Sequence, residues 1–514
     1  MARRSGRLDA ANKPHRGNAT SASEPQKDVI RHLTDYYRCL DRHVPFALKG
    51  AVSEPNGYFR FGKDAICYGR NCGGQVSDSA AGTLHDALPN ATGSNGTTYL
   101  PFDLAEVLDN LRYERYVGDW HEGYATSTLA RIYYFLRPLL PFGMRSYLKR
   151  LHLRSRDALR FPRWPVDCSV DSLVEQLLLL AVRSNGNREI PFIWFWPEGA
   201  SSCAIMTHDV ETEEGRRFCS KLMDIDDSFG IKASFQIIPE ERYDVSTEFL
   251  SSFEDRGFEV VVHDLNHDGH LFRDREQFLR RAARINQYRE QYGVQGFRAA
   301  VLYRKQEWFD ALKFSYDMSV PNVAHLDPQH GGCCTVMPYF IGSIVELPVT
   351  TTQDYMLFHV LNDYSINLWK QQTDLIMEKH GLMSFIVHPD YIVENRERTV
   401  YEALLAYLSE LREKSEVWIT TPGEVNRWWR QRAGMRIVED GHNLRIEGVG
   451  NERARIAYAC EEDGRLVFTF HSQSADQVIS PGSQGGKSQS ARRNGPSVVG
   501  SENSPHVIDH VPNS

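Results

Sequence analysis

Two histidines, His263 and His267, lie four residues apart directly after a short apolar run. If the chain turns helically there, both imidazoles share one face and can bind the same metal ion. Two acidic residues, Asp209 and Glu211, follow another apolar run earlier in the chain. Imidazole suits zinc, iron, cobalt and nickel better than magnesium or calcium. These residues predict a divalent-metal site, with zinc as the first choice and cobalt or nickel as alternatives.

The third protein ligand of such a site must come from outside the histidine pair. Asp209 or Glu211 can supply it, and the residues alone leave the choice open. Two histidines and one carboxylate leave coordination positions for water and substrate, which is typical of catalytic rather than structural metal sites. The alternative interpretation is that His263 and His267 are loop residues with ordinary hydrogen-bond partners.

Each pair of polar residues stands at the end of a predicted buried strand. The segments 203–211 and 258–267 contain short apolar runs that stop at the acids and at the histidines. Such runs, rich in valine and isoleucine, are typical of buried strands. Parallel α/β sheets and βα barrels place their chemistry at the C-terminal ends of the strands. We therefore expect the two strands to bring all four side chains to one point.

Predicted strands and helices alternate between residues 190 and 432. Repeated strand–helix units indicate a parallel sheet, either open or closed into a barrel. The number of predicted strands favours a barrel, so we predict an α/β fold, a distorted (β/α)7-type barrel, for this central domain. The predicted strands are 204–207, 232–238, 259–262, 296–301, 316–319, 344–349, 382–387 and 417–420.

The rest of the chain flanks this domain. Residues 1–26 are polar and predict a disordered leader, and residues 27–189 predict an N-terminal α+β accessory region whose role the sequence does not indicate. Short alternating strands at 433–471 predict a small β appendage. The last segment, 472–514, is dominated by Ser, Gly, Gln and Asn and predicts a disordered tail.

A basic segment within the accessory region, residues 130–163, combines apolar positions with a run of arginines and lysines. A basic amphipathic segment can lie on an anionic membrane surface, which predicts a peripheral membrane contact. The alternative is a helical hairpin that packs on the central domain and keeps its basic side in water.

The net charge, the cysteine content and the first residues of the 514-residue chain limit the kinds of partner and the compartment that we expect. The formal net charge of −8 argues against nucleic acid as the main partner. Nine cysteines without a C-x-x-C pair favour a reduced compartment. The first residues are followed by polar side chains rather than an apolar core, so we expect no signal peptide and a cytoplasmic protein.

Five segments of the central domain, taken in order, resemble the motifs of the polysaccharide deacetylase family (NodB homology, carbohydrate esterase 4). They are Thr-His-Asp-Val-Glu at 207–211, His-Asp-Leu-Asn-His at 263–267, Gly-Phe-Arg-Ala-Ala at 296–300, Tyr-Asp-Met-Ser-Val at 316–320 and Phe-Ile-Val-His-Pro at 385–389. The resemblance implies a NodB-like distorted barrel with its site at the strand ends. It also implies a metal-dependent hydrolase that acts on N-acetylated carbohydrate.

Carried over residue by residue, the resemblance implies a role for each motif residue. His263 and His267 would be metal ligands, Asp209 the general base, Arg298 the partner of that base, and His388 the general acid.

The first motif departs from the family's usual pair of adjacent carboxylates because Val210 intervenes. Members with a D-x-D spacing use the second acid as the ligand, which implies Glu211 here. The rival assignment makes Asp209 the ligand and leaves the base open. His208 and His270 are further candidates near the metal, for which loop or supporting roles are expected.

Two classes of function follow. The first is a hydrolase that removes N-acetyl groups from a glycan or a sugar precursor, with a cytoplasmic precursor of surface polysaccharide as the favoured substrate; a related option is a hydrolase of a non-sugar amide. The second is a catalytically silent glycan-binding or assembly protein on the same barrel, which the altered first motif favours.

Overall fold

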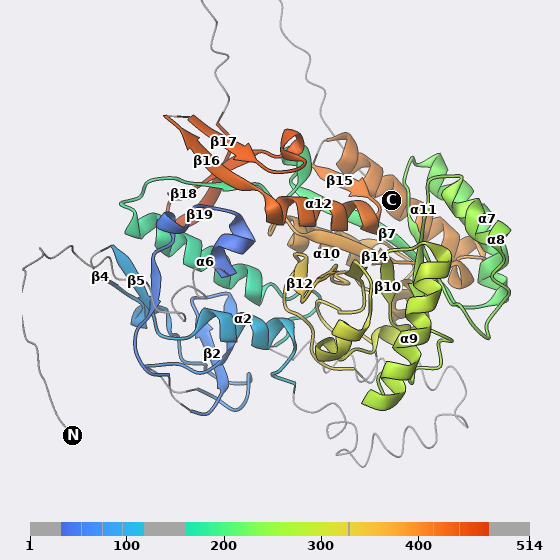
Figure 1. Ribbon diagram of the computed structural model, residues 1–514, viewed down its shortest axis with the longest axis horizontal. Helices are drawn as coiled ribbons and strands as arrows, with labels where there is room; N and C mark the ends of the chain where they lie inside the picture. The colour runs from blue at the N-terminus through green and yellow to red at the C-terminus, as the bar shows by residue number, and fades with distance from the viewer. Residues whose placement is uncertain are drawn as a thin grey trace, which may run out of the picture. The chain divides into compact units, whose positions relative to one another are not determined.

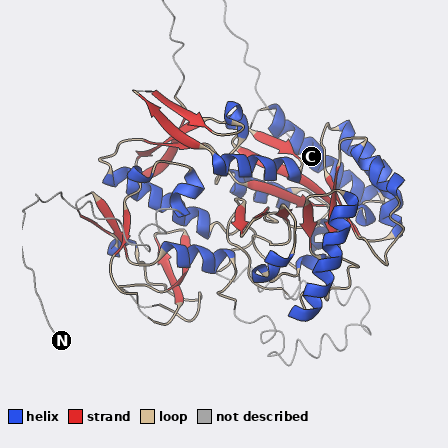
Figure 2. Cartoon of the chain, viewed as in Figure 1, coloured by secondary structure: helices blue, strands red, loops and turns tan. Residues whose placement is uncertain are grey.

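The computed structural model describes residues 32–117 and 161–471, apart from residues 53, 74–75, 95, 327–328, 415 and 442. Figure 1 and Figure 2 show the arrangement of these parts. The predicted leader at 1–26, the predicted tail at 472–514 and nearly all of the basic segment at 130–163 lie outside the described residues. Those three expectations stay predictions.

A nine-stranded sheet lies at the centre of the described residues. Its strands are β7 (Ser202–Val210), β8 (Ser234–Ile237), β9 (Glu259–His263), β10 (Gly296–Arg298), β11 (Tyr316–Asp317), β12 (Tyr339–Ile341), β13 (Ile344–Glu346), β14 (Leu382–Ile386) and β15 (Val417–Thr420). The order across the sheet is β12-β13-β11-β10-β9-β8-β7-β14, and β15 also pairs with β7. All pairs are parallel except β12 with β13, as repeated strand–helix units require.

Six helices connect or follow these strands: α7 (Glu213–Ser228), α8 (Thr247–Glu254), α9 (Arg275–Tyr292), α10 (Asn367–Met377), α11 (Asn395–Glu413) and α12 (Pro422–Gly434). Helices α7, α8 and α11 lie together on one side of the central strands (Figure 1). The side chains of Thr212, Ser246 and Asp274 cap α7, α8 and α9, because each accepts a backbone N–H that the first turn leaves without a partner. Of the helices in the described ranges, none is both long and apolar enough to span a bilayer.

The sheet curls, but no backbone ladder closes it among the described strands. Instead, the chain after β13 runs beside β14. The hydroxyls of Thr350 and Thr351 donate to the carbonyls of Leu382 and Ser384 at 2.7 and 2.8 Å, and the N–H of Ser384 donates back to Thr350 Oγ1 at 2.9 Å. Side-chain hydrogen bonds thus replace a ladder at this seam. The predicted α/β fold is confirmed, with a sheet that curls into a half-barrel, whereas the predicted distorted (β/α)7-type barrel is not confirmed.

Several predicted elements are shorter or tighter than expected. The strand predicted at 296–301 ends at Arg298 and continues as the 3-10 turn η5 (Ala300–Leu302). The next segment of the chain is also 3-10, η6 (Gln306–Ala311). A π-helical turn, η7 (Met356–Leu361), precedes α10. These irregular segments follow the ends of β10 and β13, on the chain that leads away from the sheet.

The described parts of the N-terminal region, residues 32–117 and 161–189, contain a three-stranded sheet, a hairpin, a helical segment at 32–37 and two longer helices. The sheet has the order β1 (Phe46–Leu48), β5 (Thr97–Leu100), β4 (Thr92–Ser94), the hairpin joins β2 (Gly57–Phe61) to β3 (Ala65–Gly69), and the helices are α2 (Leu104–Arg112) and α6 (Ser169–Ser184). The fully buried side chains Leu173, Val174 and Leu177 of α6 lie in one core with Phe59 and Cys67 of the hairpin.

The C-terminal segment contributes the hairpin β16 (Arg436–Asp440)–β17 (Asn443–Glu447) and the hairpin β18 (Ile456–Glu462)–β19 (Arg465–Thr469). Strand β6 (Ile190–Ile193) precedes the central sheet in sequence, yet it pairs antiparallel with β18. A single sheet therefore contains strands that precede and follow the nine-stranded sheet in sequence. The domain boundaries at residues 189 and 432 stay predictions.

Candidate metal and catalytic site

Strand β7 points successive side chains to opposite faces of the sheet, so that its carboxylate falls on the inner face. Met206 and Val210 pack in the core shared with the outer helices, whereas Ile205 lies in the opposite core. Asp209 is on the same face as Ile205, and Glu211 follows directly after the end of the strand. Both carboxylates are thereby delivered to one rim of the sheet, as the sequence predicts for a strand end.

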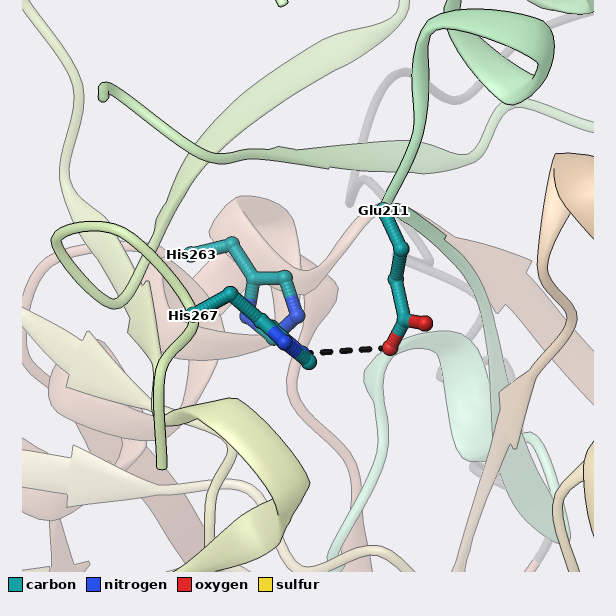
Figure 3. Close-up of side chains that lie close together, drawn as sticks. All are labelled: Glu211, His263 and His267. Carbon is teal, nitrogen blue, oxygen red and sulfur yellow. Dashed lines mark ion pairs between the residues drawn. The ribbon is translucent and has the colours of Figure 1, made fainter. Parts of the chain in front are cut away.

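The structure brings Glu211, His263 and His267 together (Figure 3). One ligand atom from each lies within 4.8 Å of the others, and His267 Nε2 lies 3.1 Å from Glu211 Oε1. His263 is the last residue of β9, and His267 lies in the loop that follows. This loop is not the helical turn that the spacing suggests: Asp264 and His267 both have φ of 56°, and these left-handed residues turn the chain so that the two rings meet.

The geometry of the two imidazoles fits a metal ion. The Nε2 atoms of His263 and His267 are buried without a hydrogen-bond partner, and the short contact of His267 with Glu211 lacks the alignment of a hydrogen bond. Nδ1 of His263 lies 3.1 Å from the carbonyl of Arg298, which directs the lone pair of Nε2 toward the cluster. Burial lowers the pKa of His263 to about 4, so its ring is neutral, as a metal ligand must be.

Arg298, the last residue of β10, binds the carboxylate of Asp209. Its NH1 group donates to Asp209 Oδ1 at 2.6 Å and to Thr207 Oγ1 at 2.8 Å, and its side chain is fully buried. Asp209 Oδ2 lies 3.8 Å from His263 Nε2. Burial raises the pKa of Asp209, but the charges of Arg298, His263 and His388 and the hydrogen bond from Arg298 together outweigh burial and lower that pKa to about 2. Asp209 is therefore ionised throughout the neutral range.

His388 follows β14 and faces the same cluster. Its Nε2 lies 3.6 Å from Glu211 Oε1, and its Nδ1 lies 2.6 Å from Asp354 Oδ1. Burial lowers the pKa of His388, but the carboxylate of Asp354, together with the charges of Glu211 and Asp209, outweighs burial and raises the pKa to about 10. Sequence reasoning missed Asp354, whose one signal is its position soon after the predicted strand 344–349.

A further carboxylate, Asp390, fixes the main chain at Glu211. Asp390 Oδ2 accepts the backbone N–H of Glu211 at 3.2 Å, and Oδ1 accepts the hydroxyl of Thr212. Asp390 can approach because residue 215 is glycine: a Cβ at Gly215 would lie 2.3 Å from Asp390 Oδ2. Glu211 is thus held beside the histidines, while Asp209 remains against Arg298.

The two other candidate histidines stand apart from the cluster. His208 points to the outer face of β7, where its Nε2 lies 3.0 Å from Asp226 Oδ2 and its Nδ1 lies 2.9 Å from the carbonyl of Val387. His270 is exposed and lies 3.5 Å from Asp268. His208 therefore contributes to the packing of the outer face, and His270 belongs to the loop that follows β9.

A cavity of about 270 Å³ opens beside these side chains. Its walls combine four titratable residues with aliphatic and aromatic ones: Asp209, Glu211, His267, His388, Val301, Leu302, Leu326, Gln353, Tyr355 and Tyr391. The rings of Tyr355 and Tyr391 lie 5.8 Å apart on one side. The ligand cluster, the ionised carboxylate and the charged imidazole are thus accessible to one small molecule at once.

No family model and no curated protein matches the chain. Solved structures similar to it include a protein from Mycobacterium smegmatis described as a polysaccharide deacetylase, with 18% identity over 46% of this chain and 93% of that chain and a TM-score of 0.37. Puue allantoinase has 13% identity over 46% and 92% of the two chains, with a TM-score of 0.36. A family 4 acetyl xylan esterase from Clostridium thermocellum, in complex with a cobalt ion, has 14% identity over 44% and 91%, with a TM-score of 0.28. At these TM-scores, function must be inferred from this chain's own side chains.

Proposed function

We propose that this protein is a metal-dependent hydrolase of the polysaccharide deacetylase type, which removes N-acetyl groups from a glycan or a sugar precursor. One observation carries the proposal. A cluster of two imidazoles and a carboxylate, an ionised Asp209 and a charged His388 meet at a single cavity, which Glu211, His267, Asp209 and His388 line. This complete set supports an enzyme over a catalytically silent glycan-binding protein.

Glu211, His263 and His267 would hold the metal. Two imidazoles and one carboxylate suit zinc, with cobalt or nickel as alternatives. A divalent metal bound there supplies a Lewis acid, which polarises an amide carbonyl and makes a water molecule acidic enough to attack it near neutral pH.

Asp209 acts as the general base that takes a proton from the attacking water. Because Arg298 donates to Oδ1, the carboxylate is held in one orientation, with Oδ2 on the side of His263. The low pKa of Asp209 keeps its carboxylate ionised, and therefore unprotonated, before the reaction.

His388 acts as the general acid. As the carbon–oxygen bond forms and the carbon–nitrogen bond breaks, the departing nitrogen needs a proton, and Nε2 of His388 is the atom that faces the cavity side of the cluster. Asp354, with Glu211 and Asp209, keeps His388 protonated, since these carboxylates raise the pKa of the imidazole to about 10 against the effect of burial. Acetate and a free amine are the products.

The cavity walls support an N-acetylated sugar as the substrate. Val301, Leu302 and Leu326 form an aliphatic wall that suits the methyl group of an acetyl, and Tyr355 and Tyr391 offer ring faces against which a sugar can pack. No lysine or arginine lines the cavity in the described part of the chain, so the reacting unit of the substrate is expected to be uncharged.

The test is acetate release from a panel of acetylated sugars, sugar nucleotides and lipid-linked sugars, with small cyclic amides included to test the non-sugar alternative. We expect turnover of at least one acetylated sugar, its loss with a chelator and its recovery with zinc, cobalt or nickel. Binding of a glycan without turnover under metal-replete conditions would instead support the silent protein. Turnover of a cyclic amide alone would reassign the substrate class.

A further inference from the structure

A buried ion pair joins the N-terminal region to the loop that forms the aliphatic wall of the cavity. The carboxylate of Glu114, which follows α2, accepts a hydrogen bond from Nε of Arg304 at 2.6 Å and another from NH2 of the same guanidinium. The two side chains are 3% and 1% exposed. A bidentate pair fixes the plane of the guanidinium as well as its position, and removal of either partner leaves a buried charge unpaired.

Arg304 and Gln329 hold the main chain of the wall. Arg304 NH1 donates to the carbonyl of Leu302 at 3.0 Å and to Gln329 Oε1 at 2.8 Å. The amide nitrogen of Gln329 donates in turn to the carbonyl of Val301. Both carbonyls of the wall are thus bound by side chains that the Glu114–Arg304 pair orients.

The wall needs this support because its backbone is strained. Val301 and Leu302 have φ of 57° and 55°. Residues with a Cβ rarely adopt this left-handed region, and a β-branched valine does so least readily. Such conformations persist only where the surroundings enforce them. Because both side chains line the cavity, relaxation of this turn would move the wall.

The same stretch of the N-terminal region also holds the loop that carries Leu326, the third aliphatic wall residue. The hydroxyl of Tyr116 donates to the carbonyl of Gly332 at 2.6 Å. Gly331 has φ of 93°, and a Cβ there would lie 2.7 Å from Val117 Cγ2 and 2.8 Å from Glu114 Oε1. Close backbone approach therefore joins residues 114–117 to this loop.

We propose that Glu114 is a positioning residue for the substrate-binding wall of the cavity, and that the stretch at 104–117 is part of the catalytic unit rather than an independent accessory module. Glu114 sets the place of Val301 and Leu302, and hence which acyl or sugar group fits. The identity of that group rests on the proposed function. The control of the wall by Glu114 does not.

The test uses the full chain with Glu114→Gln, and with Glu114→Gln combined with Arg304→Met, which removes both charges at similar volume. Hydrogen exchange measured by mass spectrometry reports on residues 299–305, and metal content reports on the ligand cluster. We expect faster exchange at 299–305 and unchanged metal content. For the best substrate, KM should rise about tenfold or more while kcat changes by less than about twofold, because the wall moves and the acid, base and ligands do not.

Glu175→Gln is the matched control, because Glu175 of α6 pairs with Lys379 across another contact between the N-terminal region and the central sheet, away from this cavity. It should lower Tm without changing KM or exchange at 299–305. The proposal is overturned if Glu114→Gln leaves exchange at 299–305 unchanged, or if Glu175→Gln changes it equally. Should the unmodified protein release no acetate from any substrate, the proposed function fails, and the exchange result still decides the role of Glu114.

Discussion

Asp354 lies 2.6 Å from Nδ1 of His388 and accepts the backbone N–H of the same residue at 2.7 Å. One fully buried carboxylate therefore holds both the ring and the main chain of the proposed general acid. Burial favours the neutral imidazole, and the charge of Asp354, together with those of Glu211 and Asp209, outweighs burial. The largest contribution to the protonation state on which the proposed chemistry depends thus comes from a residue outside the five motifs.

Replacement of Asp354 by asparagine should shift the pH dependence of the reaction. Without the carboxylate, the largest of the influences that raise the pKa of His388 is lost, whereas burial and the charges of Glu211 and Asp209 remain, so that pKa should fall well below about 10. The alkaline limb of the kcat profile should move toward acid by about one pH unit or more, and activity on that limb should fall at least about tenfold. The pair should also stabilise the fold fully below about pH 6.5, and this contribution should be lost as the pH rises through about 10. Rate profiles and an NMR titration of His388 measure the first effect, and Tm as a function of pH measures the second.

Asp226→Asn provides a matched control for that substitution, because Asp226 is an equally buried partner of a histidine, His208, on the outer face of β7. It should lower Tm and leave the alkaline limb in place. An unchanged limb in Asp354→Asn would assign the proton donor to another group.

The strand ends could be predicted from the sequence because their apolar runs stop abruptly at charged residues. Asp209, His263 and Arg298 end or nearly end β7, β9 and β10. Strands β9 and β10 pair in parallel and β8 joins β9 to β7 in parallel, so all three strands end at one edge of the sheet. Asp354 could not be predicted in the same way. It follows the three-residue strand β13, and it reaches His388 because the sheet curls until the chain after β13 runs beside β14.

The contact between β14 and the chain after β13 is a second feature that the sequence does not predict. Alternating strands and helices predict a parallel sheet, but the contact between β14 and the chain after β13 depends on hydroxyl groups of Thr350 and Thr351 that donate to carbonyls of β14. Threonines in a loop are common, and their spacing gives no periodic signal. The left-handed turn at Val301 is equally hidden, since valine is among the residues least expected there.

Metal binding should depend on the three clustered side chains. The purified protein should bind about one equivalent of zinc, cobalt or nickel, and a chelator should lower Tm because the metal binds only the folded state. His263→Ala should abolish both the binding and the metal-dependent rise in Tm. His270→Ala, a histidine in the same loop that lies outside the cluster, should bind metal normally. A protein that stays metal-free under replete conditions would contradict the proposed function.

Replacement of Asp209 by asparagine should separate binding from catalysis. The amide keeps the size of the carboxylate but cannot accept the proton of water, so the rate of acetate release should fall by about two to four orders of magnitude. Metal content should remain near that of the unmodified protein, because Glu211 rather than Asp209 lies with the histidines. Loss of metal in this variant would make Asp209 a ligand, and retained activity would transfer the role of base to another residue.

The close contact between Gly215 and Asp390 should affect metal affinity, because Asp390 holds the main chain of the proposed ligand Glu211. In Gly215→Ala, the new methyl group would occupy a point 2.3 Å from Asp390 Oδ2, so Asp390 must leave the backbone N–H of Glu211. Loss of such a supporting hydrogen bond should weaken metal binding by about tenfold to a hundredfold, measured by competition with a chromogenic chelator. Gly434→Ala is the matched control, since a Cβ at this other helical glycine meets nothing within 4 Å. Equal metal affinity in both variants would show that Glu211 keeps its place without Asp390.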